Sequence, residues 1–350
     1  MFIYIGMYIL ILLNMVLFFF LKNRKLEKLL FILFIVILSV LAGTRLNVGV
    51  DYISYINIFE NVNSNLEIRG VEKLFLFIVY TLKNNYYLKN ESIFLVFSII
   101  NFFLLYRFVI RNLNSNLFIS LFIWYTFYFL RLDMGQFRFE LAILICLNLI
   151  FYFEKASYIK FLLGVLFSFF IHKTSIIYFS VLLVKSKILK KKNIFFIIIF
   201  SFFIGKIIIS SNVLVLVGNL VNSLKLKSMV YGKSVYEVGF SFYQLYIILI
   251  FIFLSFYKTK NFRINLYKKI YNLGVCFYFL FINLAIFSDR MSLIFIIIQI
   301  VLYPLVINDM RKRNNKIIIL LFIIVISSYV FFNSLLNSIE THIPYNSWLF

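Results

Sequence analysis

The chain has 350 residues, of which 63% are hydrophobic, and its mean hydropathy is +1.00. A water-soluble fold needs polar residues to cover its surface, so this composition excludes an ordinary soluble domain. The formal net charge is +22, but the basic residues stand in short clusters between apolar runs, a pattern of membrane topology rather than of nucleic-acid binding. The sequence therefore predicts an all-α polytopic membrane protein, with membrane lipid and no nucleic acid as its partner.

Apolar runs predict roughly 12 transmembrane helices, within a range of about 10–14. The first run lacks a preceding basic region and a small-residue cleavage site, so we expect it to be retained as a helix. The stretch 158–184 is interrupted at His172 and is interpreted as two short helices, with one long helix as the alternative. The predicted spans are 2–21, 27–43, 92–110, 117–131, 138–153, 158–171, 174–184, 194–211, 242–257, 270–288, 291–308 and 317–333.

The basic loops alternate along the chain and predict its orientation. Lys and Arg are retained on the cytoplasmic side, so the basic loops are expected to be cytoplasmic and both termini extracytoplasmic. Residues 1–350 then form a single integral membrane domain, with outer segments at 44–91, 212–241 and 334–350. The apolar run 71–83 is too short to cross and predicts an interfacial or re-entrant helix. Six segments hold 22 of the 35 basic residues: 22–28, 107–116, 154–160, 185–193, 258–269 and 309–316.

Four arginines lie at the predicted outer ends of the spans, namely Arg45, Arg131, Arg138 and Arg290. An ionisable group near hydrocarbon lines a cavity, pairs with a partner or marks a substrate path. Guanidinium stays charged and offers a planar fork that matches phosphate oxygens, so the set predicts a site for a polyanion such as pyrophosphate. The alternative is that each arginine pairs with a nearby carboxylate and only anchors a helix end.

His172 is the candidate general base, because it stands between two apolar helices and titrates near neutral pH. Asp51 and Glu72 are the rival bases, or they orient His172 or an arginine. His342 is predicted to lie on the surface. No set of His, Cys or carboxylate residues has the spacing of a zinc site. Most aromatic residues are expected to pack within the membrane, and Tyr55 is one of the few outer-segment tyrosines that are candidate carbohydrate contacts.

Several short motifs, taken in order, resemble the EpsG-like family of exopolysaccharide polymerases, which are related in function to the Wzy-type polymerases. Each motif is short, but the ordered set covers nearly the whole chain. Val50 before Asp51, and Glu140 beside Arg138, depart from the family pattern. The motifs are Gly43-Thr44-Arg45, Val48-Gly49-Val50-Asp51-Tyr52 with Tyr55 and Phe59, Glu72 with Phe75, Arg138 with Ala142, His172-Lys173-Thr174-Ser175, Arg290, and Tyr345 to Phe350.

The resemblance implies a GT-C-like glycosyltransferase of the bacterial cytoplasmic membrane. It would join oligosaccharide repeat units carried on undecaprenyl pyrophosphate at the outer face, for a capsular polysaccharide, an exopolysaccharide or O-antigen. Donor and acceptor are then both lipid-linked, no cofactor is needed, a metal-independent mechanism is favoured, and a flippase and a chain-length regulator are expected partners. The four arginines would neutralise the leaving pyrophosphate, His172 would take the acceptor proton, and Asp51 or Glu72 would orient it or the sugar.

Three other functions share much of this pattern. A flippase or transporter of the same lipid-linked sugars would also use arginines and many spans, but it should carry ionisable groups at mid-membrane. An O-acyltransferase would need a histidine within reach of a cytoplasmic acyl donor, whereas His172 is predicted to be outside. A polysaccharide ligase shares nearly all the features of a polymerase.

Overall fold

The computed structural model describes residues 1–64, 66–68, 70–186, 191–207 and 242–349. The secondary-structure elements named in these ranges are all helices, which confirms the all-α class. A helix satisfies its own backbone hydrogen bonds, as a bilayer requires. Four helices are long and apolar enough to cross a membrane, or five if one bent helix pair counts as a single span. The chain is therefore a membrane protein, and the larger predicted number of spans stays a prediction.

The four candidate spans agree with four of the predicted ones. They are α1 (Phe2–Leu21), α2 (Arg24–Gly43), α5 (Asn90–Asn112) and α16 (Arg313–Asn337). The bent pair is α14 (Ala285–Ile296) with α15 (Gln299–Asp309), which meet at 42°. The sequence places a boundary between spans at Asp289 and Arg290, but both lie inside α14. The reason is that the chain turns earlier, at residues 281–284, and a charged pair does not by itself end a helix.

The chain divides into two compact units, Met1–Ile176 with Tyr303–Phe350, and Ile177–Leu302. In the first unit, α2 packs against α5, and α5 packs against α7 (Phe137–Glu154). Next to α7 lies α8 (Tyr158–Ile171), and α1 packs against α6 (Leu117–Trp124). In the second unit, α13 (Phe262–Leu280) is packed between α9 (Lys191–Ile207), α12 (Phe242–Phe256) and α14. The predicted outer segment 212–241 lies outside the described residues.

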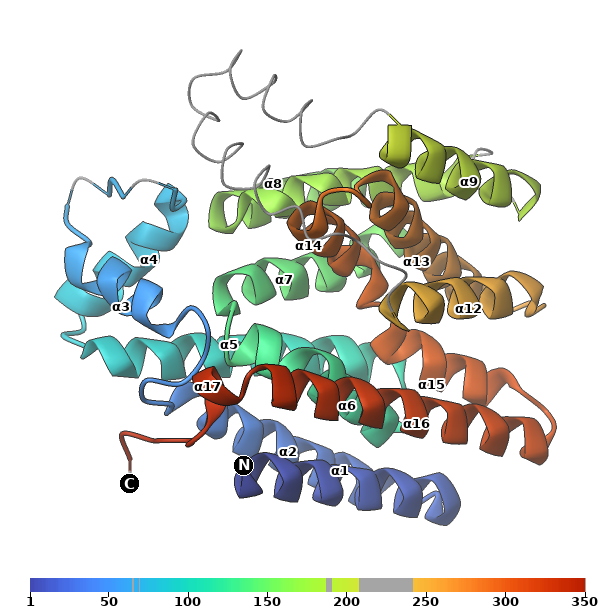
Figure 1. The fold of residues 1–350 in the computed structure, drawn as a ribbon, viewed down its shortest axis with the longest axis horizontal. Helices are drawn as coiled ribbons and strands as arrows, with labels where there is room; N and C mark the ends of the chain where they lie inside the picture. The colour runs from blue at the N-terminus through green and yellow to red at the C-terminus, as the bar shows by residue number, and fades with distance from the viewer. Residues whose placement is uncertain (65, 69, 187–190, 208–241, 350) are drawn as a thin grey trace. The chain divides into compact units, whose positions relative to one another are not determined.

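Two short helices follow α2 in the first unit and lie beside α5, as Figure 1 shows. They are α3 (Tyr52–Asn61) and α4 (Lys73–Asn84). The second of them confirms that the run 71–83 is a short helix, whereas its interfacial or re-entrant position stays a prediction. Glu72 is the residue immediately before α4, so the start of this helix fixes where its carboxylate stands.

Two helices change their winding next to sequence-predicted site residues. α6 continues as a π-helix, η1 (Tyr125–Asp133), and a short turn then leads to α7. π-Helical turns are rare and are frequent at functional sites. α8 ends at Ile171, and a 3₁₀ helix, η2 (Lys173–Lys185), begins after His172. The structure thus separates the stretch 158–184 into two helices, at the residue where the sequence predicted the break.

A cluster of aromatic rings fixes α3 and α4 against α5 and α7. Phe137, the first residue of α7, is at its centre, with ring centroids 4.0 Å from Tyr55, 5.1 Å from Phe97 and 6.1 Å from Phe75. Large aromatic side chains bury much apolar area, so this cluster is a rigid base for the residues around it. The residue that follows Phe137 is Arg138. The term aromatic cluster refers below to the following seven buried residues: Tyr52, Tyr55, Phe59, Phe75, Phe94, Phe97 and Phe137.

Candidate functional site

Glu72 and Arg138 form an ion pair at the edge of the aromatic cluster. Nη1 of Arg138 donates to Oε2 of Glu72 over 2.5 Å, and the two side chains are 15% and 8% exposed. The guanidinium also lies over the ring of Phe75, with its central carbon 5.4 Å from the ring centroid. Because the pair is largely withdrawn from water, its attraction is screened less than that of a surface pair. Arg138 is therefore held in one orientation.

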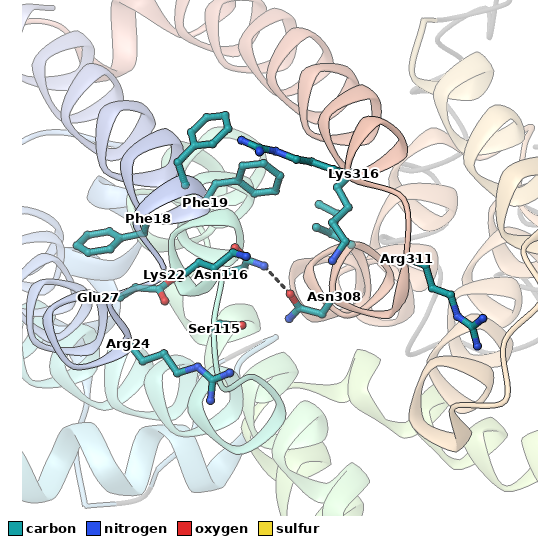
Figure 2. Close-up of a pocket in the computed structure, with 13 residues that line it drawn as sticks. Phe18, Phe19, Lys22, Arg24, Glu27, Ser115, Asn116, Asn308, Arg311 and Lys316 are labelled. Carbon is teal, nitrogen blue, oxygen red and sulfur yellow. Dashed lines mark hydrogen bonds between the residues drawn. The ribbon is translucent and has the colours of Figure 1, made fainter.

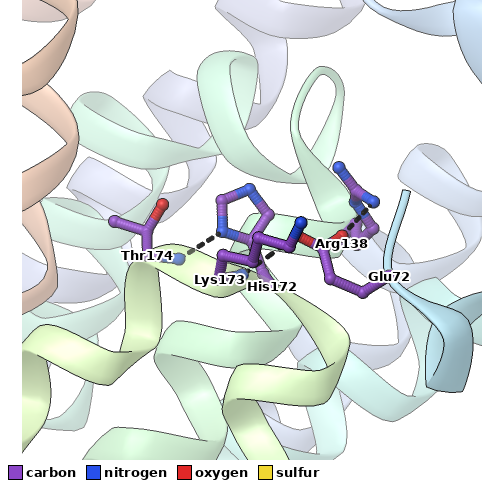
Figure 3. Close-up of polar contacts among 5 residues, drawn as sticks. All are labelled: Glu72, Arg138, His172, Lys173 and Thr174. Carbon is purple, nitrogen blue, oxygen red and sulfur yellow. Dashed lines mark hydrogen bonds and ion pairs between the residues drawn. The ribbon is translucent and has the colours of Figure 1, made fainter. Parts of the chain in front are cut away.

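The second oxygen of Glu72 connects this ion pair to the histidine segment. Its Oε1 accepts a hydrogen bond from the backbone N–H of Lys173 over 3.1 Å. The side chain of Lys173 is exposed, so its backbone and not its charge makes the contact. Figure 3 shows Glu72 between Arg138 on one side and the His172–Thr174 segment on the other. One carboxylate thus joins three segments that are far apart in sequence, and its two oxygens both accept hydrogen bonds.

His172 stands where α8 ends. Its backbone is extended, with φ −150° and ψ 118°, and its N–H still bonds the carbonyl of Ser168 over 2.9 Å. The hydroxyl of Ser168 in turn donates to the carbonyl of Ala142 in α7 over 3.0 Å, which ties the two helices together. The imidazole packs on the ring of Phe139, with centroids 4.9 Å apart. The ring of His172 is therefore positioned by both helices.

A backbone contact with Thr174 indicates which ring nitrogen of His172 carries the proton. Nδ1 accepts the backbone N–H of Thr174 over 3.3 Å. In a neutral imidazole one nitrogen donates and the other accepts, so this contact places the proton of the neutral ring on Nε2. His172 consequently offers a donor in this arrangement. To accept a proton from a substrate on Nδ1, it has to release the contact with Thr174.

Tyr55 lies beside Arg138 but is 6% exposed, inside the aromatic cluster. Burial raises the pKa of its phenol to about 12, against the opposing effect of the nearby Arg138. Asp51 precedes α3, is half-buried, and opposes Arg138 by raising the pKa of Tyr55. The hydroxyl of Tyr55 therefore stays protonated at neutral pH, and the aromatic ring faces other rings.

Arg45 occupies a second, fully buried position on the other side of the cluster. It is 1% exposed, its Nη1 donates to the carbonyl of Ala42 over 2.5 Å, and its guanidinium lies 4.5 Å from the ring centroid of Phe94. Burial lowers its pKa to about 10, partly offset by attraction to Tyr55, Asp133 and Glu140. Arg45 thus keeps its charge at neutral pH and faces two buried carboxylates inside the protein.

Asp133 and Glu140 are that pair of carboxylates, 3% and 1% exposed. Oδ2 of Asp133 accepts the indole N–H of Trp124 over 2.9 Å. The sequence drew attention to Glu140 as a departure from the family pattern, but it did not indicate that both acids share one buried site with Arg45. The available signal in the sequence is a pair of acids close together, Asp133 as the last residue of η1 and Glu140 in the first turn of α7.

The segment after α2 is closed by the C-terminal tail. Leu46 N–H donates to Asn346 over 2.9 Å, Trp348 N–H donates to Thr44 over 3.0 Å, and the hydroxyl of Tyr345 donates to Leu41 over 2.8 Å, all onto backbone carbonyls. The motif at Gly43-Thr44-Arg45 and the motif at Tyr345 to Phe350 are thus joined side by side. Residues 334–350 are therefore not a free tail along their whole length.

Gly49 is required where the segment after α2 contacts the turn after η1. Its φ is +107°, which favours glycine, and a Cβ there would lie 1.8 Å from the carbonyl oxygen of Met134. Its N–H donates to the carbonyl of Thr341 over 2.8 Å. Gly49 therefore allows three chain segments to approach closely just before Asp51.

His342 corrects a prediction. The sequence suggests surface because the residue stands in a polar segment, but it is 1% exposed and its Nε2 is 3.1 Å from the carbonyl of Leu130. Burial lowers the pKa of its imidazole. The tail folds back onto η1, and hydropathy along the chain carries no signal of such a long-range contact.

The remaining arginines are placed as follows. Arg131 is half-buried in the last turn of η1, and its backbone carbonyl accepts the N–H of Gln136 over 3.0 Å. Arg290 is half-buried in α14, within the second unit. Direct contacts thus bring together Glu72, Arg138 and the His172 segment, with Tyr55 beside them. In the described ranges, no group of three or more His, Cys, Asp or Glu side chains forms a candidate metal site.

Comparison with known proteins identifies the family of the chain. No curated protein and no solved structure matches the chain significantly. The EpsG family model does match it, over residues 28–347. That range includes Arg45, Glu72, Arg138 and His172, together with Tyr345 and Asn346 of the tail. The chain belongs to the EpsG family.

Proposed function

We propose that the chain is a polysaccharide polymerase that joins oligosaccharide repeat units carried on undecaprenyl pyrophosphate at the outer face of the cytoplasmic membrane. Family membership links it to exopolysaccharide polymerisation, and its apolar helices place it in a membrane. The observation that carries the proposal is the carboxylate of Glu72, which holds Arg138 and the His172 segment together. A polymerase of this kind needs a fixed cation for the leaving diphosphate and a proton acceptor near it.

Arg138 is the proposed contact to the pyrophosphate. Its side chain is 15% exposed, and Nη1 is held by Glu72. A guanidinium that is fixed by one carboxylate and partly open to solvent can donate to phosphate oxygens from its exposed edge. Arg131 and Arg290, which direct contacts do not join to Arg138, stay candidates for the same anion.

Glu72 acts as a positioning residue in this mechanism. Its two oxygens accept hydrogen bonds from Arg138 and from Lys173 N–H, an arrangement that suits it to hold both partners in place. His172 is the remaining candidate in the cluster, once its contact with Thr174 opens. Asp51 stays an alternative base or an orienting group, and Tyr55, buried as it is, contributes packing beside Arg138.

The bond changes are those of a glycosyl transfer. The acceptor hydroxyl forms a new bond to the anomeric carbon of the donor, and the bond from that carbon to the pyrophosphate oxygen breaks. The acceptor proton passes to His172, and the leaving diphosphate keeps the electron pair and is stabilised by Arg138. Each cycle therefore lengthens the glycan by one repeat unit and releases the carrier diphosphate.

The test compares Arg138→Ala with Arg107→Ala, because Arg107 is an exposed arginine in α5 outside the cluster. At matched membrane levels, Arg138→Ala should leave single repeat units on the lipid carrier, whereas Arg107→Ala should give the normal polymer ladder. A normal ladder from Arg138→Ala would remove that residue from the site.

The same cells separate the polymerase from its rivals. A flippase defect would trap lipid-linked units in the inner leaflet, so their delivery to the outer leaflet should be unchanged in Arg138→Ala. A ligase defect would leave full-length polymer on the carrier instead of single units. An O-acyltransferase defect would give a normal ladder that lacks acyl groups.

A further inference from the structure

A basic pocket lies at the opposite end of α1 and α2 from Arg45, within the first unit. It has a volume of about 470 Å³ and is formed by three segments: the α1–α2 turn, the α5–α6 turn, and the chain from α15 into α16. Figure 2 shows labelled residues from all three segments around the hydrogen bond from Asn116 to Asn308, which is 2.5 Å long. Its five cationic lining residues are Lys22, Arg24, Arg311, Arg313 and Lys316.

The charge of this pocket is not compensated. Its one acidic lining residue is Glu27, which is 2% exposed and whose Oε1 accepts the backbone N–H of Leu117 over 2.5 Å. That carboxylate caps the start of α6 and attracts Arg24, so it offsets at most one of the five positive charges. In the part of the chain that the structure describes, none of the five cations forms an ion pair with a carboxylate. The pocket consequently attracts an anion.

The walls of the pocket indicate an amphiphilic anion. Phe18, Phe19 and Phe20 line it from the end of α1, a helix apolar enough to span a membrane, and the ring of Phe20 is half exposed. The cations stand in the turns between helices and in the first turns of α2 and α16, which is the level of lipid headgroups beside a bilayer. An apolar wall that continues into a cationic rim matches a phospholipid. The acyl chains would lie along the apolar wall, and the phosphate would lie at the cationic rim.

We propose that this pocket binds the phosphate headgroup of an anionic phospholipid. Basic pockets between helices at the cytoplasmic interface are suited to anionic headgroups. The loops that form it are among those predicted to be cytoplasmic, so the lipid comes from the inner leaflet, away from the Glu72–Arg138 site. It connects the first two helices to α16, and it acts as a structural ligand rather than as a substrate.

The test uses delipidated full-length protein in a neutral detergent, with thermal unfolding as the readout. Dioleoylphosphatidylglycerol should raise the midpoint temperature saturably, dioleoylphosphatidylcholine should not, and inorganic phosphate should not at the same phosphate concentration. If inorganic phosphate gives the same shift, the pocket takes a free anion and the lipid assignment is overturned.

A matched pair of double variants separates this pocket from general basicity. Lys22→Gln/Lys316→Gln removes one lining cation from each of two segments, whereas Lys25→Gln/Lys312→Gln removes one exposed, non-lining cation from each of the same two segments. With about 1 kcal/mol per lysine near an anionic surface, the first pair should weaken half-saturation by phosphatidylglycerol about 30-fold, and the second should leave it unchanged. Equal weakening in both would mean diffuse attraction without a site. The assay needs no polymerase activity, so its outcome is independent of the proposed function.

Discussion

Arg45 and Arg138 lie near the same aromatic cluster, yet their environments differ. The Arg138 side chain is 15% exposed and is paired with Glu72. Arg45 is fully buried among rings, backbone and two acids. A charge without access to solvent has no route to a substrate unless the protein opens, whereas Arg138 stands where a ligand can compete for it. We therefore infer that Arg45 belongs to the framework and that Arg138 is the arginine open to a ligand, a distinction that sequence patterns alone do not make.

The largest expected effect is on stability, from Arg45→Ala. Removing this side chain leaves a cavity against the rings of Phe94 and Phe137 and takes away the charge that attracts Asp133 and Glu140, which should cost about 2–5 kcal/mol. We expect a large fall in the thermal midpoint of detergent-purified protein and reduced membrane levels, with Arg107→Ala as the unaffected control. If the Arg45→Ala variant kept its stability but lost polymer formation, Arg45 would have a role in the reaction and the distinction between the two arginines would be wrong.

The next effect is on catalysis, from His172→Asn. Asparagine keeps a hydrogen-bonding side chain but cannot accept a proton, so the joining rate should fall by about 100-fold or more. The thermal midpoint should stay near that of the wild type, because the position is half-buried and asparagine can keep a hydrogen bond to the Thr174 backbone. If the variant retained most of the joining rate, His172 would have only a hydrogen-bonding role, and Asp51 would be the preferred candidate for the base.

Lys173→Pro tests the positioning role of Glu72 more selectively. Proline removes the backbone N–H that binds Glu72, and it suits the first residue of a helix that follows an extended residue. We expect about a tenfold loss of the joining rate, from one hydrogen bond to a charged group. Lys173→Ala keeps the N–H and should behave as the wild type. The same loss in both variants would point to the lysine charge instead.

The smallest effect is expected from Tyr55→Phe. Its pKa of about 12 means that the native state holds a proton which the unfolded chain, with a pKa near 10, releases. The stabilisation of the native state by the protonated phenol of Tyr55 is complete below about pH 10 and is lost as the pH rises toward 12. Thermal midpoints measured from pH 7 to pH 11 should fall less steeply at the alkaline end in the variant, with no change near pH 7. An altered joining rate at pH 7 would give the hydroxyl a direct role.

Much of the helical fold could be predicted from the sequence, because the patterns that indicate helices are local. Long apolar runs predict α1, α2, α5 and α16, and one polar interruption predicts the break at His172. Sequence patterns left Asp51 and Glu72 as alternative acids that could orient an arginine. They could not select Glu72, because it is 66 residues from Arg138, and the N–H of Lys173 that binds the same carboxylate is 101 residues from Glu72. The burial of Arg45 is equally non-local: its rings come from α5 and α7, and hydropathy ranks any arginine as exposed.

The pairing of residues 44–49 with residues 341–348 also constrains how the protein is made. Thr44 and Tyr345 are 301 positions apart, so the early segment leaves the ribosome long before its partner exists. During that interval Arg45 lacks its final enclosure, and the helices between them must enter the bilayer first. Assembly of the framework is thus completed after translation of α16, and a stalled or truncated chain would expose an unprotected cation to quality control.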